Sequence, residues 1–426
     1  MIFNFGDIIL VKFLGDNKFT LTQEPTVQSA LFAMDPHTGL VRVMIGGYDF
    51  AKSEFNRTTQ ALRQTGSLWK PFVYAAALDK GYTFETTLVD SPIVYPVDEG
   101  EYWKPKNYGD KFVGDTTFLN SLTHSRNVPT VKVANDIGIN YVTAYVRKLG
   151  LTTPIDKYLS MALGSNAAYL NEMVNAYSVF ANKGMRPNPI YITKIEDHDG
   201  TILEEYTPNL EAKDNFASSD TSPEVADEIK KLLAEYEVPI SSLNQKLFLS
   251  QQKNIIEDEI HLYKDEINIL YGPSIPENYI ISPQTSYLMV EMLKNVVQNG
   301  TGHRAKELGK PVAGKTGTTN DETDAWFIGF VPDLVAGIWI GYDNIKPIGK
   351  NEAGGRTAAP IFLEFMQEVT KDWEAKDFEA PKGLNIENIA TLTGGSCPYE
   401  RKESIKEEAA SQKENDRAVD FFDENI

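Results

Sequence analysis

The chain has 426 residues, 42% of them hydrophobic, so it can hold one large domain with a packed core and small appendages. Its formal net charge of −19 argues against nucleic-acid binding, which favours basic patches. The single cysteine, Cys397, excludes an intrachain disulfide, and the five histidines show no metal-ligand spacing, so we predict neither a metal nor a cofactor.

Strand patterns occur near both ends of the chain. Residues 7–15 predict a strand and then a turn. Four further runs read as buried strands in two pairs, 27–34 with 40–45 and 325–331 with 334–342. Because helical segments lie between the two pairs, we expect one antiparallel sheet that is closed by segments far apart in the sequence.

The first motif with chemical content is Ser67-Leu68-Trp69-Lys70, where a loop leads into an apolar helix. Gly66 permits a sharp turn before it, and Pro71 is tolerated only in the first turn of a helix, so we expect the helix to begin near Ser67. Ser67 and Lys70 share a helix face, and the helix N-terminus favours a developing oxyanion. Taken alone, Ser67 is equally well explained as a helix N-cap.

To act as a base, Lys70 has to be neutral at least transiently, whereas the pKa of a free lysine is about 10.4. Burial and a second cation nearby both lower the pKa of a lysine. Lys315 is the candidate for that cation. We therefore expect the pKa of Lys70 to lie well below that of a free lysine.

The second motif, Ser125-Arg126-Asn127, follows a predicted helix at 117–124 and precedes Pro129. A helix that ends here offers a short polar loop to a cleft. In such a loop the Ser125 hydroxyl can relay a proton to a leaving amine, and the Asn127 side chain can hold a substrate amide. Alone, the motif is better explained as an ordinary loop between helices.

The third motif, Lys315-Thr316-Gly317-Thr318, lies in residues 311–319, which predict an edge strand beside a cleft. Gly317 lets a ligand approach the backbone closely. Lys315 and the two threonines are suited to binding a carboxylate. The Thr318 N–H can pair with the Ser67 N–H as an oxyanion hole.

No one of these motifs is specific by itself, because the chain contains further matches. They are Ser250 with Lys253, Ser242 with Asn244, and the turn His37-Thr38-Gly39. The match at Ser250 lies in a polar, acidic stretch with no glycine turn before it. Together and in order, however, S-x-x-K, S-x-N and K-T-G are typical of penicillin-binding proteins and class A β-lactamases.

With these motifs the chain resembles the transpeptidase domain of class A (bifunctional) penicillin-binding proteins, over roughly residues 20–200 and 280–370. The resemblance extends to short segments in unbroken order: 23–25, 46–50, 55–57, 63–67, 103–108, 124–127, 162–165, 176–182, 314–320, 324–327 and 354–360. It implies the α+β fold of serine β-lactamases and DD-peptidases, with a central antiparallel sheet and helices on both faces.

The resemblance also implies an activity, the cross-linking of peptidoglycan stem peptides that end in D-Ala-D-Ala, and covalent inhibition by β-lactam antibiotics. It makes Ser67 the nucleophile, Lys70 its base and Ser125 the proton relay. The substrate-binding residues that it implies are Asn127, Lys315, Thr316, Gly317 and Thr318. Water as the acceptor would give D-Ala-D-Ala carboxypeptidase activity instead.

Three alternatives share some of these features. A serine β-lactamase also needs a glutamate that activates water, but Glu172 lies in residues 169–175, which predict an amphipathic helix. A β-lactam sensor is acylated once and attaches to membrane signalling helices, which this sequence does not show. An inert scaffold fragment remains as the third alternative, and the intact motifs argue against it.

Two features depart from the family. Class A members carry a membrane helix and a glycosyltransferase domain ahead of this region, and neither occurs in this sequence, so we interpret it as a fragment or a truncated product. A location outside the cytoplasmic membrane, at its periplasmic face, follows from the resemblance only. The second departure is residues 201–280, which hold 16 Asp and Glu against 6 Lys and Arg.

We interpret residues 201–280 as a solvated acidic insertion, with a helix at 222–236 and an amphipathic stretch at 241–271; a partner-docking site or a lid is the sharper alternative. The predicted domain order is the end of a small OB-like domain at 1–25, the transpeptidase domain at 26–200 and 281–376, the insertion between its two parts, and an acidic tail at 377–426 that is disordered beyond about Tyr399.

Overall fold

The structure is a computed structural model that describes residues 6–96, 102–206, 279–319, 321–382, 384 and 386–393. The chain divides into two compact units, Met1–Pro381 and Lys382–Ile426. Helix α11 (Ile386–Thr393) belongs to the second unit, and every other element described below belongs to the first.

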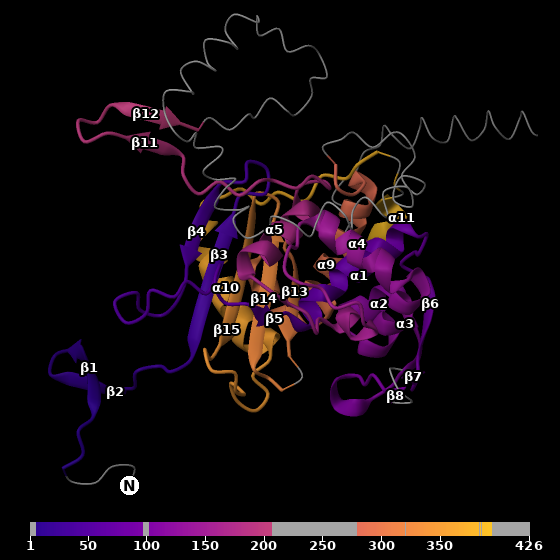
Figure 1. Cartoon of the computed structure of the whole chain (residues 1–426), viewed down its shortest axis with the longest axis horizontal. Helices are drawn as coiled ribbons and strands as arrows, with labels where there is room; N and C mark the ends of the chain where they lie inside the picture. Colours follow the sequence, from indigo (N-terminus) through magenta and orange to yellow (C-terminus); the bar gives the residue numbers. More distant parts are fainter. Residues whose placement is uncertain are drawn as a thin grey trace, which may run out of the picture. The chain divides into compact units, whose positions relative to one another are not determined.

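A five-stranded antiparallel sheet organises the first unit, with the strand order β13-β14-β15-β3-β4 (Figure 1). Its strands are β3 (Gln28–Met34), β4 (Val41–Ile45), β13 (Ala313–Thr318), β14 (Asp324–Val331) and β15 (Leu334–Gly341). The pairing of β15 with β3 joins the two ends of the domain. The predicted strand pairs, and the prediction of one sheet closed by distant segments, are confirmed.

Helices cover both faces of this sheet (Figure 1). A Cβ added at Gly329 in β14 would approach Phe362 of α10 (Gly354–Val369) to 2.6 Å. A Cβ at Gly337 in β15 would approach Val174 of α5 (Leu170–Ala181) to 2.5 Å. Gly329 pairs with the residue before Gly337, so the two glycines face opposite sides. The implied α+β fold is therefore correct, and glycine at these positions lets each helix pack closely.

Among the described residues, the segment between the two parts of the sheet contains the helices that were predicted there. Its elements are η1 (Gly66–Trp69), α1 (Lys70–Asp79), α2 (Phe118–Thr123), α3 (Asn127–Ile137), α4 (Ile139–Leu149), η4 (Leu159–Leu163), α9 (Pro283–Asn299) and η7 (His303–Leu308). Short strands and one short helix complete it: β5 (Arg63–Gln64), β6 (Thr87–Asp90), β7 (Tyr95–Pro96), β8 (Tyr102–Trp103), η3 (Tyr108–Asp110), β9 (Gly114–Thr117), β10 (Ala167–Ala168), β11 (Lys194–Glu196) and β12 (Ile202–Glu205).

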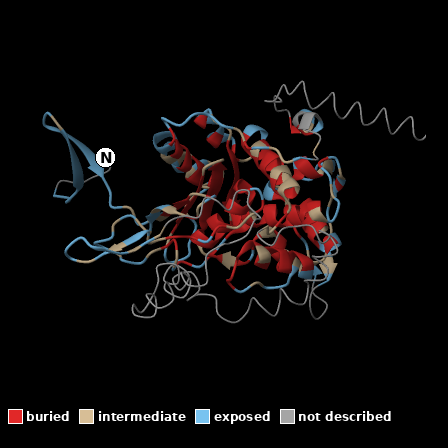
Figure 2. Ribbon diagram, turned by 90° about the horizontal axis from the view of Figure 1, so that it is seen from above, coloured by how far each residue is buried: buried red, intermediate tan, exposed pale blue. Residues whose placement is uncertain are grey.

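Helix α1 is the central helix of the core, because every residue from Lys70 to Leu78 is buried. It contacts α3, α4 and α9. Figure 2 shows the buried residues concentrated in the sheet and the helices around it. An apolar helix packed on all sides is rigid, so the residues at its N-terminal end are held in fixed positions.

The N-terminal segment forms a separate two-stranded hairpin, β1 (Leu10–Gly15) with β2 (Lys18–Thr22). Its side chains are almost all exposed, as Figure 2 also shows. The predicted strand in this segment is confirmed. No helix among the described residues is both long and apolar enough to cross a membrane.

Several predictions lie outside the described residues. They are the helix at 222–236, the amphipathic stretch at 241–271, the matches at Ser242 and Ser250, and the tail beyond Tyr399. The domain boundaries stay a prediction.

Candidate active site

Ser67 lies where three backbone segments meet. Gly66 has a φ of +55°, and its N–H donates to the carbonyl of Gly164 at 3.1 Å. A side chain on Gly66 would collide with the Thr318 carbonyl at the end of β13. Glycine is therefore required before Ser67, both for its left-handed backbone and for close approach to the third motif.

The expected helix start is confirmed with one refinement. A 3₁₀ turn, η1, carries Ser67, and α1 follows at Lys70 with Pro71 in its first turn. Ser67 is half-buried, and in the described part of the chain no side chain or backbone group hydrogen-bonds its hydroxyl. The hydroxyl is therefore open to a substrate.

Lys70 is fully buried, and its ammonium nitrogen is held by the second motif. Nζ donates to the Ser125 carbonyl at 2.5 Å, to Ser125 Oγ at 3.1 Å and to Asn127 Oδ1 at 2.7 Å. The first and second motifs thus meet at one nitrogen atom, although 55 residues separate Lys70 from Ser125.

Lys315 reaches the same serine from the third motif. Its Nζ donates to Ser125 Oγ at 3.0 Å and to the Thr316 carbonyl at 3.0 Å. A serine hydroxyl has two acceptor positions and one donor. Because Ser125 Oγ accepts from both lysines, its own proton is free to point toward a third group.

Both lysines have lowered pKa values. Burial lowers the pKa of Lys70 well below its ordinary value, and the nearby charge of Lys315 lowers it further. Burial lowers the pKa of Lys315 to about 7. Two ammonium groups that share one hydroxyl in a dry site do not readily carry charge together. The direction expected for Lys70 is confirmed, with Lys315 as the second cation.

The backbone of Ser125 adopts the left-handed region, with a φ of +53°. A non-glycine residue in this region stores about 1–3 kcal/mol of strain and persists only where its surroundings hold it. The Ser125 N–H donates to the Leu122 carbonyl at 2.9 Å, and its carbonyl accepts from Lys70. Strain of this kind clusters at functional sites. Here the left-handed backbone directs the Ser125 side chain toward Lys70 and Lys315, which the backbone of an ordinary helix end would not do.

The Asn127 side chain makes bonds at both ends within the protein. Oδ1 accepts from Lys70, and Nδ2 donates to the Lys106 carbonyl at 2.7 Å. The buried Asn107 accepts from the Asn127 N–H at 2.9 Å and donates to Asp90 at 2.7 Å. Asn127 therefore orients Lys70 in this structure, in addition to the substrate-binding role expected for it.

The threonines of the third motif also have partners. Thr316 Oγ1 lies 2.8 Å from Thr301 Oγ1, and Thr318 Oγ1 accepts from the Gly354 N–H of α10 at 3.0 Å. Their strand, β13, is an edge of the sheet and pairs with β14 only. The predicted edge strand is confirmed, and an edge strand leaves backbone groups for a substrate to pair with.

A buried ion pair joins the segment before Ser67 to β14. Arg63 Nε donates to Asp324 Oδ1 at 2.7 Å. Trp339 Nε1 donates to the same oxygen at 2.8 Å, and Thr323 Oγ1 donates to Oδ2 at 2.8 Å. Asp324 thus holds the chain segment before Ser67 against β14, the strand that follows the third motif.

Sequence reasoning missed three of these supporting residues: Asn107, Thr301 and Asp324. Asn107 and Asp324 occur in segments that carry the family resemblance, which was the only signal available for them. No spacing rule links them to the motifs, because each acts through a contact across the fold.

Two other residues considered from the sequence lie elsewhere. The turn with His37 joins β3 to β4 and takes no part in the site. Glu172 is buried in α5, as the helix prediction required, where it accepts from the Thr152 hydroxyl and has its pKa raised by burial.

Comparisons with known proteins identify the family. A sequence model of the penicillin binding protein transpeptidase domain matches residues 29–252 and 256–367. The chain is 34% identical over 420 residues to penicillin-binding protein 1A of Rickettsia prowazekii (strain Madrid E). This alignment covers 98% of this chain and 48% of that protein. It is 35% identical over 396 residues to penicillin-binding protein 1A of Pseudomonas aeruginosa, and this alignment covers 92% of this chain and 46% of that protein. The chain thus spans about half the length of these curated relatives.

Solved structures show the same fold. The crystal structure of penicillin-binding protein 1A from Haemophilus influenzae superposes with a TM-score of 0.68 at 26% identity, over 88% of this chain and 52% of that one. The PonA1 protein from Mycobacterium tuberculosis in complex with penicillin V has a TM-score of 0.59 at 19% identity, over 85% and 83%.

Proposed function

Because the chain belongs to the penicillin-binding protein transpeptidase domain family, we propose that it is a D,D-transpeptidase that cross-links peptidoglycan stem peptides through an acyl-enzyme on Ser67. The observation that carries the proposal is the position of Ser125 Oγ, which accepts from both Lys70 and Lys315. This contact joins all three motifs in one proton-handling site.

In the first step, neutral Lys70 takes the proton of Ser67, and Oγ attacks the carbonyl of the penultimate D-Ala. The lowered pKa of Lys70 supports this role, because a base has to be unprotonated near the working pH. The N–H groups of Ser67 and Thr318 would bind the oxyanion. Losing one such donor typically slows a reaction about 100- to 1000-fold.

In the second step, the bond between the carbonyl carbon and the terminal D-Ala nitrogen breaks. The leaving amine needs a proton, which Lys70 returns through Ser125. The Ser125 hydroxyl supports this relay, since both of its acceptor positions are occupied by lysines and its proton is free.

In the third step, the amine of a neighbouring stem peptide attacks the carbonyl carbon of the Ser67 ester. The proton of the amine passes through Ser125 to Lys70, and Lys70 returns a proton to Ser67 Oγ as the ester bond breaks. Water in place of that amine would give carboxypeptidase activity from the same acyl-enzyme. With a β-lactam, Ser67 attacks the carbonyl of the lactam ring, and the reaction stops at the resulting Ser67 ester. Because peptidoglycan lies outside the cytoplasmic membrane, a domain with this function would act there.

Recognition of the substrate carboxylate falls to Lys315 with Thr316 and Thr318. Burial without a fixed anionic partner lowers the pKa of Lys315 to about 7. A substrate carboxylate nearby would favour its charged form. We therefore expect Lys315 to become protonated as the substrate binds. Its positive charge then lowers the pKa of Lys70, which favours the neutral form of that lysine.

The proposal is tested by intact mass spectrometry after incubation with benzylpenicillin, with the Ser67→Ala variant as the control. We expect one covalent adduct that persists in the wild type and is missing in the variant. An adduct that clears as the drug is hydrolysed would identify a β-lactamase. No adduct on a folded protein would refute the acyl-enzyme altogether. A protein that forms this persistent adduct but transfers no D-Ala-D-Ala stem peptide, either to an amine or to water, would be a sensor.

A further inference from the structure

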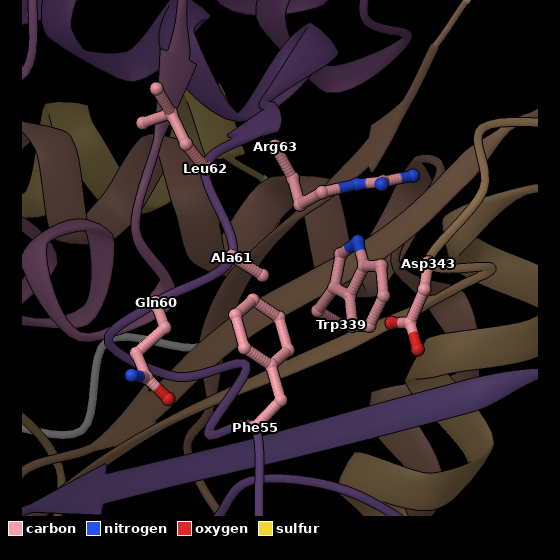
Figure 3. Close-up of a pocket in the computed structure, with 7 residues that line it drawn as sticks. All are labelled: Phe55, Gln60, Ala61, Leu62, Arg63, Trp339 and Asp343. Carbon is pink, nitrogen blue, oxygen red and sulfur yellow. The ribbon is translucent and has the colours of Figure 1, made fainter. Parts of the chain in front are cut away.

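A cavity of about 380 Å³ lies beside the segment that leads to Ser67, close to the end of β15 (Figure 3). It is lined by Phe55, Gln60, Ala61, Leu62, Arg63, Trp339 and Asp343. None of these seven residues belongs to the three motifs. The volume is within the range of sites that bind small ligands, about 300–1,000 Å³.

Arg63 supplies this pocket with hydrogen-bond donors that have no acceptor. It is 7% exposed, and its Nε is occupied by Asp324. Its Nη2 is fully buried and has no partner among the described residues, and neither has Nη1. A buried donor without an acceptor destabilises a protein by about 1–3 kcal/mol. Nη2 is closed to solvent, whereas Nη1 is not fully buried, so Nη1 is the unsatisfied donor that a ligand oxygen can reach.

Figure 3 shows how this edge is aimed. The guanidinium extends over the Trp339 ring toward the side of the pocket where Asp343 lies. Its carbon is 5.1 Å from the ring centroid. The indole nitrogen donates to Asp324, so that Trp339 and Arg63 are fixed by one carboxylate. The donor edge is thus held rigidly at the wall of the pocket.

The charges around the pocket are already paired. Asp324 neutralises Arg63 at 2.7 Å, and Arg57 binds both oxygens of Asp343 at 2.7 and 2.6 Å. This contact with Arg57 lowers the pKa of Asp343, so that carboxylate keeps its negative charge. A ligand carboxylate would face it. The acceptor that fits Arg63 is therefore an uncharged carbonyl.

Apart from Gln60, the uncharged residues of the wall are apolar, and the wall is partly open. Phe55 and Leu62 are 42% and 45% exposed; the Phe55 ring lies beside the buried Trp339, whereas the Leu62 side chain points away from it (Figure 3). Aromatic walls with one fixed donor suit an amide group that carries an apolar side chain.

We propose that this pocket binds an uncharged peptide segment, whose backbone carbonyl accepts from the Nη edge of Arg63 and whose apolar side chain packs between Phe55 and Trp339. The site is distinct from the Ser67 site and does not depend on the transpeptidase reaction.

The test uses N-acetyl-L-phenylalaninamide as the probe and follows the indole N–H resonance of Trp339 by NMR, assigned with Trp339→Phe. We expect that resonance to shift saturably. N-acetylglycinamide, which has both amides and no ring, should bind at least about tenfold more weakly because it buries less apolar surface. 3-Phenylpropionate should also bind more weakly, because its carboxylate faces Asp343.

Two variants locate the binding. Phe55→Ala removes one wall and should weaken binding about tenfold, whereas Phe50→Ala, 75% exposed and outside the pocket, should not. Arg63→Lys removes the donor edge, and the Phe55 pair keeps the test valid if that variant does not fold. Acylating Ser67 with benzylpenicillin beforehand should leave binding unchanged.

Four results would each overturn the proposal. They are no shift up to the solubility limit of the probe, equal binding of the glycine compound, tighter binding of the carboxylate, and loss of binding after acylation of Ser67. A Trp339 resonance that shifts with protein concentration alone would identify a second copy of the chain as the occupant instead, and would also refute the assignment to a peptide ligand.

Discussion

The charge of Lys315 should control how readily Lys70 acts as a base, and Lys315→Met tests this. Both ammonium nitrogens hydrogen-bond to Ser125 Oγ, at 3.1 and 3.0 Å, so they are no more than about 6 Å apart. At an effective dielectric constant of about 20, two like charges at this distance repel by about 3 kcal/mol. Methionine keeps the volume of the side chain and removes that repulsion.

The sign follows from which form the repulsion disfavours. Lys315 disfavours the protonated form of Lys70, so its removal raises the pKa of Lys70. Below that pKa, the neutral fraction of Lys70 should fall about 100-fold, since 1.36 kcal/mol corresponds to a factor of ten. Burial, the larger cause of the lowered pKa, is unchanged by the substitution.

The assay is the maximal rate of acylation by a β-lactam at saturating concentration, measured against pH. Saturation separates this rate from the weaker binding expected when Lys315 no longer meets the drug carboxylate. We expect the acid limb of the profile to move to higher pH in Lys315→Met. Lys371→Met, which removes a surface charge paired with Glu368, should leave it in place. An acid limb that stays, or moves to lower pH, would refute the reasoning.

Three further predictions concern the frame of the site. Asp324→Ala leaves Arg63 buried without its partner and should lower the free energy of unfolding in urea by about 3–5 kcal/mol. Gly66→Ala should slow β-lactam acylation at least about 100-fold, because the new Cβ pushes the Thr318 end of the oxyanion hole away. Asp79 is buried with its pKa raised from 3.8 to about 6, so its contribution to stability is fully present below pH 3.8 and is lost as the pH rises through 6, by about 3 kcal/mol in total. Asp79→Asn should remove this dependence in unfolding curves taken across that range.

Each of these has a result that contradicts it. An Asp324→Ala variant as stable as the wild type would mean that Arg63 is not held by this ion pair. Gly81→Ala is the control for Gly66→Ala, because it has a φ of +91° and nothing within 4 Å, so equal slowing in both would point to backbone strain alone. A pH dependence that survives in Asp79→Asn would assign it to other groups.

The family resemblance and the sheet could be predicted because their signals are local. The strand pairs follow from apolar runs with turn residues between them, such as Pro332-Asp333, and the helix start at Ser67 follows from Gly66 and Pro71. The direction of the Lys70 pKa was also predictable, because a lysine that acts as a base has to be neutral and Lys315 was available as a second cation. The roles of the eight site residues remain proposals.

By itself the sequence determined which groups are present and in what order: a serine and a lysine one helical turn apart, a serine and asparagine after a helix, and a lysine on an edge strand. Only the tertiary structure decided that Lys70 and Lys315 converge on one hydroxyl, that Asn127 holds Lys70, and that Asp324 holds Arg63. These contacts join residues 55 to 261 positions apart. No local spacing encodes them, because they arise from the packing of α1, α3 and the sheet as whole bodies around a common core.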